Sequence, residues 1–189
     1  MADDLVTTLK ELRAAAAAFD NAGVEDGIMQ LEWFTDDDGT WGVELFAAVK
    51  SLLDDAVFLN AGQSYRLVSA LELDWNELSE RQHAELRPLL TAAFDKYGDW
   101  LGSQLTADIF AERYADEAAY DTLARLSRTA AHAPARALAA YGIGRLARTL
   151  ERGPMYDRAI AALNELCTST EEYVAQEARD ALVRLSKRE

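Results

Sequence analysis

Residues 117–187 repeat one helical pattern, and this repeat constrains the fold more than any other feature of the sequence. Pro134 and Pro154 each stand at a helix start, where proline is tolerated because the first amides have no partner. Four amphipathic segments result, at 117–131, 134–150, 155–167 and 171–187. The links between them are short, which predicts two antiparallel helical hairpins.

The two hairpins align with each other at a spacing of 36 to 39 residues. The matched positions are Tyr120-Asp121 with Tyr156-Asp157, Leu123 and Leu126 with Ile160 and Leu163, and Ile143, Arg145 and Leu146 with Leu182, Arg184 and Leu185. Periods near about 40 residues with two helices per unit are typical of helical solenoids.

The second helix of each hairpin, residues 135–146 and 174–185, resembles the inner helix of the HEAT repeat. That helix reads Val-Arg, two free positions, two alanines, one free position, Ala-Leu-Gly, one free position and Leu. The first copy keeps the arginine, the alanine pair, the glycine and the final leucine, whereas Ala175 and Val183 replace the arginine and glycine in the second. The resemblance covers about 70 residues and implies a superhelical stack whose concave face binds proteins. Independently of it, the small residues at 139, 140, 142 and 144 predict close approach between partner helices.

Alanine, leucine, glutamate and arginine dominate the whole chain, which favours helix nearly everywhere. Further helices are expected at 3–21, 24–34, 41–59, 63–73, 80–97 and 103–115. Gly23 is the expected stop of the first, Ser79 and Gln82 form a predicted capping box, and Pro88 predicts a kink or break.

We therefore predict an all-α fold of antiparallel hairpins stacked as a short HEAT-like solenoid. Residues 117–189 would form the two HEAT-like hairpins, and residues 1–116 an acidic helical N-terminal part, either of degenerate units or as a separate cap. Together they are expected to make one continuous compact unit.

Residues 24–45 allow a second interpretation. Met29, Leu31 and Trp33 alternate with polar residues, and so do Trp41, Val43 and Leu45 beyond the Asp37-Asp38-Gly39 turn, which is a β-hairpin pattern. We favour a helix pair, because the polar loop leads into a strongly helical stretch.

The 33 acidic and 19 basic residues give a net charge of −14, and they are unevenly placed. Residues 1–60 carry 13 acidic and 3 basic groups, residues 61–116 carry 10 and 5, and residues 117–189 carry 10 and 11. Such a surface repels nucleic acid and anionic membranes and attracts a basic protein partner. The plainer interpretation is that acidity keeps the protein in solution.

The composition of the chain argues against a catalytic or metal-binding role. Cys167 is the single cysteine, expected as a small core residue, and His83 and His132 are the only histidines. No nucleophile–base pair, phosphate loop or set of paired metal ligands is recognisable, so we predict no catalysis, no cofactor and no metal. No apolar run approaches the ~20 residues of a membrane span, and the acidic start lacks a signal-peptide core, so a cytoplasmic location is expected.

The Asp36-Asp37-Asp38-Gly39 turn resembles part of a calcium-binding loop. Placing Gly39 at position 6 puts Phe34 and Leu45 at two ligand positions, so the EF-hand pattern fails and a solvated acidic turn is favoured. Aromatic residues beside charges are good interface anchors. The candidate partner interface therefore comprises Trp33, Asp36, Asp37, Asp38, Trp41 and Glu44, with a core position as the alternative for Trp41.

Arg145, Arg148 and Arg152 share one helical face. They could bind a phosphate or an acidic peptide, but pairing with acidic residues of a neighbouring helix is favoured. The leading functional hypothesis is a small non-catalytic immunity or inhibitor protein that covers a basic toxin, a resemblance of style rather than of motif. The alternatives are a HEAT-like scaffold or adaptor, and an enzyme on a HEAT-like frame of the bilin lyase or DNA glycosylase type.

Overall fold

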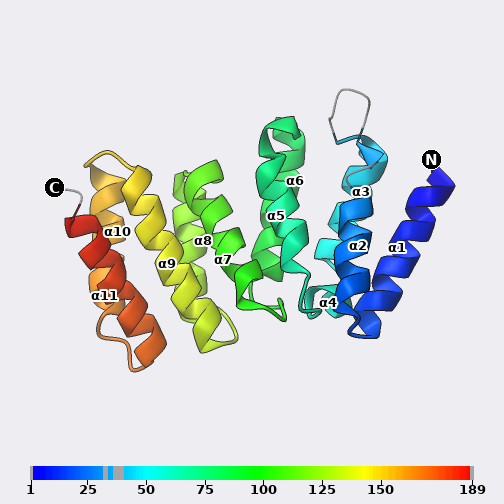
Figure 1. Ribbon diagram of the computed structural model, residues 1–189. Coiled ribbons are helices and arrows are strands. Elements are labelled where there is room, and N and C mark those ends of the chain that lie inside the picture. The colour runs from blue at the N-terminus through cyan, green and yellow to red at the C-terminus, as the bar shows by residue number, and fades with distance from the viewer. Residues whose placement is uncertain (1, 32–33, 36–40, 188–189) are drawn as a thin grey trace. The chain divides into compact units, whose positions relative to one another are not determined.

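The computed structural model describes residues 2–31, 34–35 and 41–187, and every regular element among them is a helix (Figure 1). The all-α prediction is confirmed. The chain forms two compact units, residues 1–102 and 103–189, and the division falls inside α7 (Trp100–Asp108). It lies earlier than residue 116, because η3 (Ile109–Tyr114) packs against helices α8 and α9 of the second unit.

The first unit packs short amphipathic helices around a leucine-rich core. Its elements are α1 (Ala2–Ala17), α2 (Asn21–Leu31), α3 (Val43–Leu53), α4 (Ala56–Leu59), α5 (Tyr65–Leu73), η2 (Trp75–Glu77) and α6 (Glu80–Ala93). Helix α1 packs against α2 and α4, and α3 packs against α6. Met29 and Leu31 lie in α2, and Val43 and Leu45 lie in α3, so the helix interpretation of this region is confirmed and the β-hairpin alternative is wrong.

Phe19, rather than Gly23, ends the first helix. Phe19 takes a left-handed conformation with φ of 55°, and the amide of Asp20 donates to the carbonyl of Ala15 at 2.9 Å. This is the Schellman ending, in which glycine usually takes the left-handed position and a bulky residue is uncommon. Gly23 lies within α2 instead, where a Cβ would come 2.9 Å from the Cβ of Ala15. Its role is close packing of α1 on α2.

The single helix expected at 41–59 is broken. The carboxylate of Asp55 accepts hydrogen bonds from the amides of Val57 and Phe58 at 3.0 and 3.2 Å, so it caps a new helix, α4. A capping aspartate competes with helix continuation in this way. Pro88, by contrast, does not end α6.

The second unit contains two helix pairs, α8 (Glu117–Thr129) with α9 (Ala133–Thr149) and α10 (Pro154–Leu166) with α11 (Glu172–Ser186). Helix α9 packs against α8, α10 and α11, and α9 and α11 lie side by side (Figure 1). The buried positions recur at a spacing of 39 residues. They are Ala135, Ala139, Gly142 and Leu146 in α9, and Val174, Ala178, Ala181 and Leu185 in α11.

Two glycines let the helices of the second unit approach closely. A Cβ on Gly144 would lie 2.6 Å from the Cβ of Ala181 in α11, and one on Gly142 would lie 2.8 Å from Leu123 in α8. Both distances are shorter than a van der Waals contact. The Cδ2 atom of Leu123 can rotate away, whereas the Cβ of Ala181 cannot, so the requirement for glycine is stricter at 144. The expected close packing of these helices is confirmed.

Candidate functional site

Only part of the predicted interface lies in the described residues. Trp33, Asp36, Asp37 and Asp38 lie outside them, whereas Trp41 and Glu44 lie inside.

Trp41 is 7% exposed and belongs to the core, the alternative that the sequence left open. Its indole Nε1 donates to Oδ2 of Asp74 at 3.1 Å. Glu44 is exposed in the first turn of α3.

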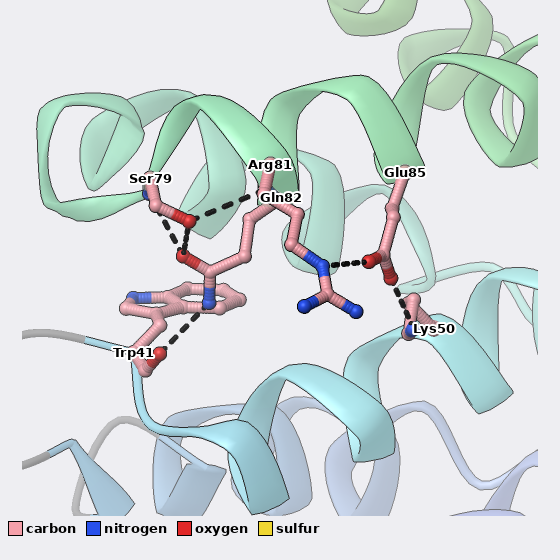
Figure 2. Close-up of polar contacts among 6 residues, drawn as sticks. All are labelled: Trp41, Lys50, Ser79, Arg81, Gln82 and Glu85. Atoms are coloured by element: carbon pink, nitrogen blue, oxygen red, sulfur yellow. Dashed lines mark hydrogen bonds and ion pairs between the residues drawn. The ribbon is translucent and has the colours of Figure 1, made fainter.

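Trp41 connects the start of α3 with the start of α6 (Figure 2). The side-chain amide of Gln82 donates through Nε2 to the backbone carbonyl of Trp41 at 2.8 Å. Oε1 of the same amide accepts from the amide of Ser79 at 2.8 Å, while the Ser79 hydroxyl accepts from the amide of Gln82 at 3.3 Å. The predicted capping box is therefore confirmed, and it has a tertiary role that the sequence did not indicate.

A second polar contact joins the same two helices (Figure 2). Glu85 of α6 pairs with Lys50 of α3 at 2.5 Å and with Arg81 at 3.0 Å. The hydrogen bond from Lys50, followed by the one from Arg81, lowers the pKa of the Glu85 carboxyl below its ordinary value. Because these groups are accessible to water, each such pair contributes little to the stability of the fold. This cluster positions helices and offers no reactive group.

Two of the three arginines, Arg145 and Arg148, lie in α9, whereas Arg152 follows the end of this helix, so the predicted shared helical face does not include it. Acidic neighbours pair with Arg145. Nε of Arg145 lies 3.3 Å from Oδ1 of Asp108, and the same guanidinium pairs with Glu112 of η3. An open pocket of about 300 Å³ lies beside this pair, and the exposed Arg148 contributes to its lining. The favoured interpretation of pairing with acidic neighbours is confirmed for Arg145.

Tyr141 completes this cluster and carries a strongly shifted pKa. Its hydroxyl donates to Oδ1 of Asp108 at 3.0 Å. Burial, and then the charge of Asp108, raise the pKa of Tyr141 to about 12. The neutral phenol is favoured in the folded chain, so the ionisation of Tyr141 opposes folding as pH rises from about 10 to about 12.

We expect the ultraviolet difference titration between the wild type and Tyr141→Phe to show one phenol that ionises near pH 12. In an Asp108→Asn background this ionisation should shift toward pH 10 but stay above it, because burial remains. A Tyr141 component centred near pH 10 in the wild type would contradict the buried hydrogen bond.

The remaining candidates for a catalytic or metal-binding role are the two histidines and the cysteine, and their surroundings are typical of structural residues. The ring of His83 stacks on Trp75 with centroids 4.3 Å apart, and its Nε2 lies 3.0 Å from the Trp75 carbonyl oxygen. His132 is an exposed residue at the start of α9. Cys167 is half-buried at the end of α10, so the expectation of a core position is wrong. It follows the last turn of that helix, whose buried stripe ends at Leu166.

Across the described residues, no three His, Cys, Asp or Glu side chains are grouped to hold a metal ion. None of the helices in this part of the chain has the length and apolar character to cross a membrane.

No family model matches the chain, and no curated protein or solved structure matches it. Its function is therefore inferred from its own geometry and charge.

An open groove between α1 and α2 is the feature that sequence reasoning missed. Its volume is about 450 Å³. Ala14, Ala15 and Ala18 are among the small residues that line it, and the acidic residues of its lining are Glu11, Asp20 and Asp26. The sequence feature that could have indicated this groove is the alanine run at 14–18, of which only Ala16 is buried in the core. The other alanines leave room at the surface because they have small side chains.

Proposed function

We propose that the chain is a non-catalytic, cytoplasmic protein-binding module that covers a basic partner, as a small immunity or inhibitor protein covers a toxin. The observation that supports this best is that the boundary between the two compact units also separates the acidic part of the chain from the nearly neutral part. The compact unit of residues 1–102 holds 20 acidic and 7 basic residues, a net of −13. Residues 103–189 hold 13 acidic and 12 basic residues, a net of −1.

The two units also differ in how their charges are used. In the second unit most acidic side chains pair with arginines, as Glu171 does with Arg136 at 2.7 Å and Glu165 with Arg128 at 2.9 Å, although Glu151 and Asp157 make no such pair within the described residues. In the first unit a group of exposed carboxylates makes no ion pair with any described residue. This group comprises Glu11, Asp26, Glu44, Asp54, Glu77 and Glu80.

Unpaired surface carboxylates on one unit produce a long-range negative potential there. Such a potential accelerates encounter with a positively charged protein and repels nucleic acid. Toxins that act on nucleic acids tend to be basic, so the same negative potential that repels the nucleic acid would attract the toxin. Binding of this kind needs no reactive group.

A HEAT-like scaffold is the second candidate. The 39-residue recurrence of buried positions in α9 and α11, and their side-by-side packing, favour it. A scaffold of this type would bind through the second unit, where charges are balanced. Exposed side chains there, such as Tyr173 at 71%, would then determine affinity.

Capture of partners from an extract of the source organism, followed by association kinetics with the purified partner, tests the proposal. We expect a positively charged partner whose association rate falls about tenfold or more between ~0.05 and ~0.5 M salt. Charge reversal in the first unit, by Glu44→Lys with Glu77→Lys, should slow association several-fold.

The matched control is Glu151→Lys with Asp157→Lys, which changes the net charge equally but in the second unit. Both of these residues are exposed. A rate that is independent of salt, with affinity sensitive to Tyr173→Ala, would favour the scaffold and reject the charge-guided module.

A further inference from the structure

We propose that the groove between α1 and α2, with Phe19 at its end, is the surface that receives the partner, and that its occupant is a lysine- or arginine-rich helix of that partner. This inference rests on the proposed function, because it names the binding surface and the chemistry of the bound segment.

The groove has the dimensions of a helix-binding site. Its lining extends along α1 from Thr8 to Ala15 and includes Ala18 just after the end of this helix, a length of about 15 Å or about three helical turns. Ala14, Ala15 and Ala18 keep the groove open, so another backbone can approach closely. No strand occurs in the described part of the chain, so a partner cannot bind there by extending a sheet.

The charges around the groove determine which helix fits. Glu11 and Asp26 are exposed and make no ion pair with a described residue. The Asp20 carboxylate accepts one hydrogen bond, from the amide of Gly23 at 3.1 Å, and keeps further acceptor capacity. Lysine or arginine side chains at the edges of a bound helix would meet these three carboxylates.

Phe19 lies in the chain between Ala18 and Asp20, which both line the groove, and it is the nearest exposed aromatic residue in the sequence. Its side chain is 71% exposed, so it contributes little to the core. Its left-handed φ of 55° would be easier for glycine. An exposed aromatic residue on a short, hydrogen-bonded turn beside unpaired charges has the properties of an interface hot spot.

The test uses the full chain and a synthetic amphipathic peptide with lysines on both edges of a leucine stripe. Binding and induced helicity are measured for the wild type, Phe19→Gly and Asp26→Lys. We expect Phe19→Gly to raise the melting temperature by about 2–4 °C and to weaken binding by about 10-fold or more. Leu73→Ala is the apolar control, since Leu73 is 79% exposed in the same unit.

Glu77→Lys is the charge control, because it is exposed, lies in the same unit and changes the net charge as Asp26→Lys does. Asp26→Lys should weaken binding several-fold more than Glu77→Lys. If Asp26→Lys and Glu77→Lys weaken binding equally and Phe19→Gly binds as the wild type does, the groove is not the binding surface. Binding that still depends on salt would in that case leave the proposed function intact. Failure of the wild type to bind this peptide at any salt concentration would also overturn the groove as the site of a basic helix, whereas the proposed function is rejected only by salt-independent association with the captured partner.

Discussion

Replacing Trp41 by alanine is expected to lower the free energy of unfolding by about 3–5 kcal/mol. The side chain is 7% exposed and lines a small apolar cavity of about 10 Å³ together with Ile28, Leu45 and Leu67. Truncation would enlarge this cavity and leave the Asp74 carboxylate without its indole donor. Thermal or urea unfolding, followed by circular dichroism, measures the loss.

Trp100→Ala is the matched control, because that tryptophan is 59% exposed. It should change stability by less than about 1 kcal/mol. Equal stability of Trp41→Ala and Trp100→Ala, with partner binding reduced only in Trp41→Ala, would return Trp41 to the interface.

Gly98→Ala is expected to destabilise the chain by about 3 kcal/mol or more, with a fall in melting temperature of roughly 10 °C. An added Cβ would lie 2.0 Å from the backbone carbonyl oxygen of Asn60. The amide of Gly98 also donates to the carbonyl of Leu59 at 2.9 Å, so the two backbone segments are already joined. A side chain could rotate away from such a contact, but a backbone carbonyl cannot.

Gly153→Ala controls for the general effect of removing a glycine. No heavy atom lies within 4 Å of the position that its Cβ would occupy. Because Gly153 caps α10, a loss of about 1 kcal/mol or less is expected. A Gly98→Ala variant as stable as Gly153→Ala would mean that the turn before α7 can separate from Asn60 at little cost.

The helices of residues 117–187 could be predicted because each carries one apolar stripe bounded by proline or a polar link. The residues that are buried in the folded chain are those of the apolar stripe. The period of 39 residues therefore occurs both in the sequence and in the pattern of buried residues. Helix ends were harder to predict where a local interaction competes with the pattern. Phe19 ends a helix without glycine, and Asp55 starts a helix inside an apolar run.

The π-helix η3, with Ala115 in a left-handed conformation after it, belongs to the same class of local deviation. Tertiary features were beyond the sequence for another reason. The groove depends on how far apart α1 and α2 lie, and that spacing follows from Gly23 and Gly27 against α1. The sequence around Trp41 does not indicate whether this side chain belongs to the core or to an interface. Its partner Asp74 is 33 residues away.

The pairing of Gly144 with Ala181 has a consequence for self-association. At the same 39-residue offset, the position in α11 that corresponds to Gly144 is Val183, which is 50% exposed. Suppose that a further hairpin packed on α11 in the way that α11 packs on α9. It would contact the isopropyl group of Val183, whereas α11 contacts the bare backbone of Gly144 in α9. The contact that joins the two pairs therefore cannot propagate from one molecule to the next, and this face of α11 resists polymerisation by its own shape.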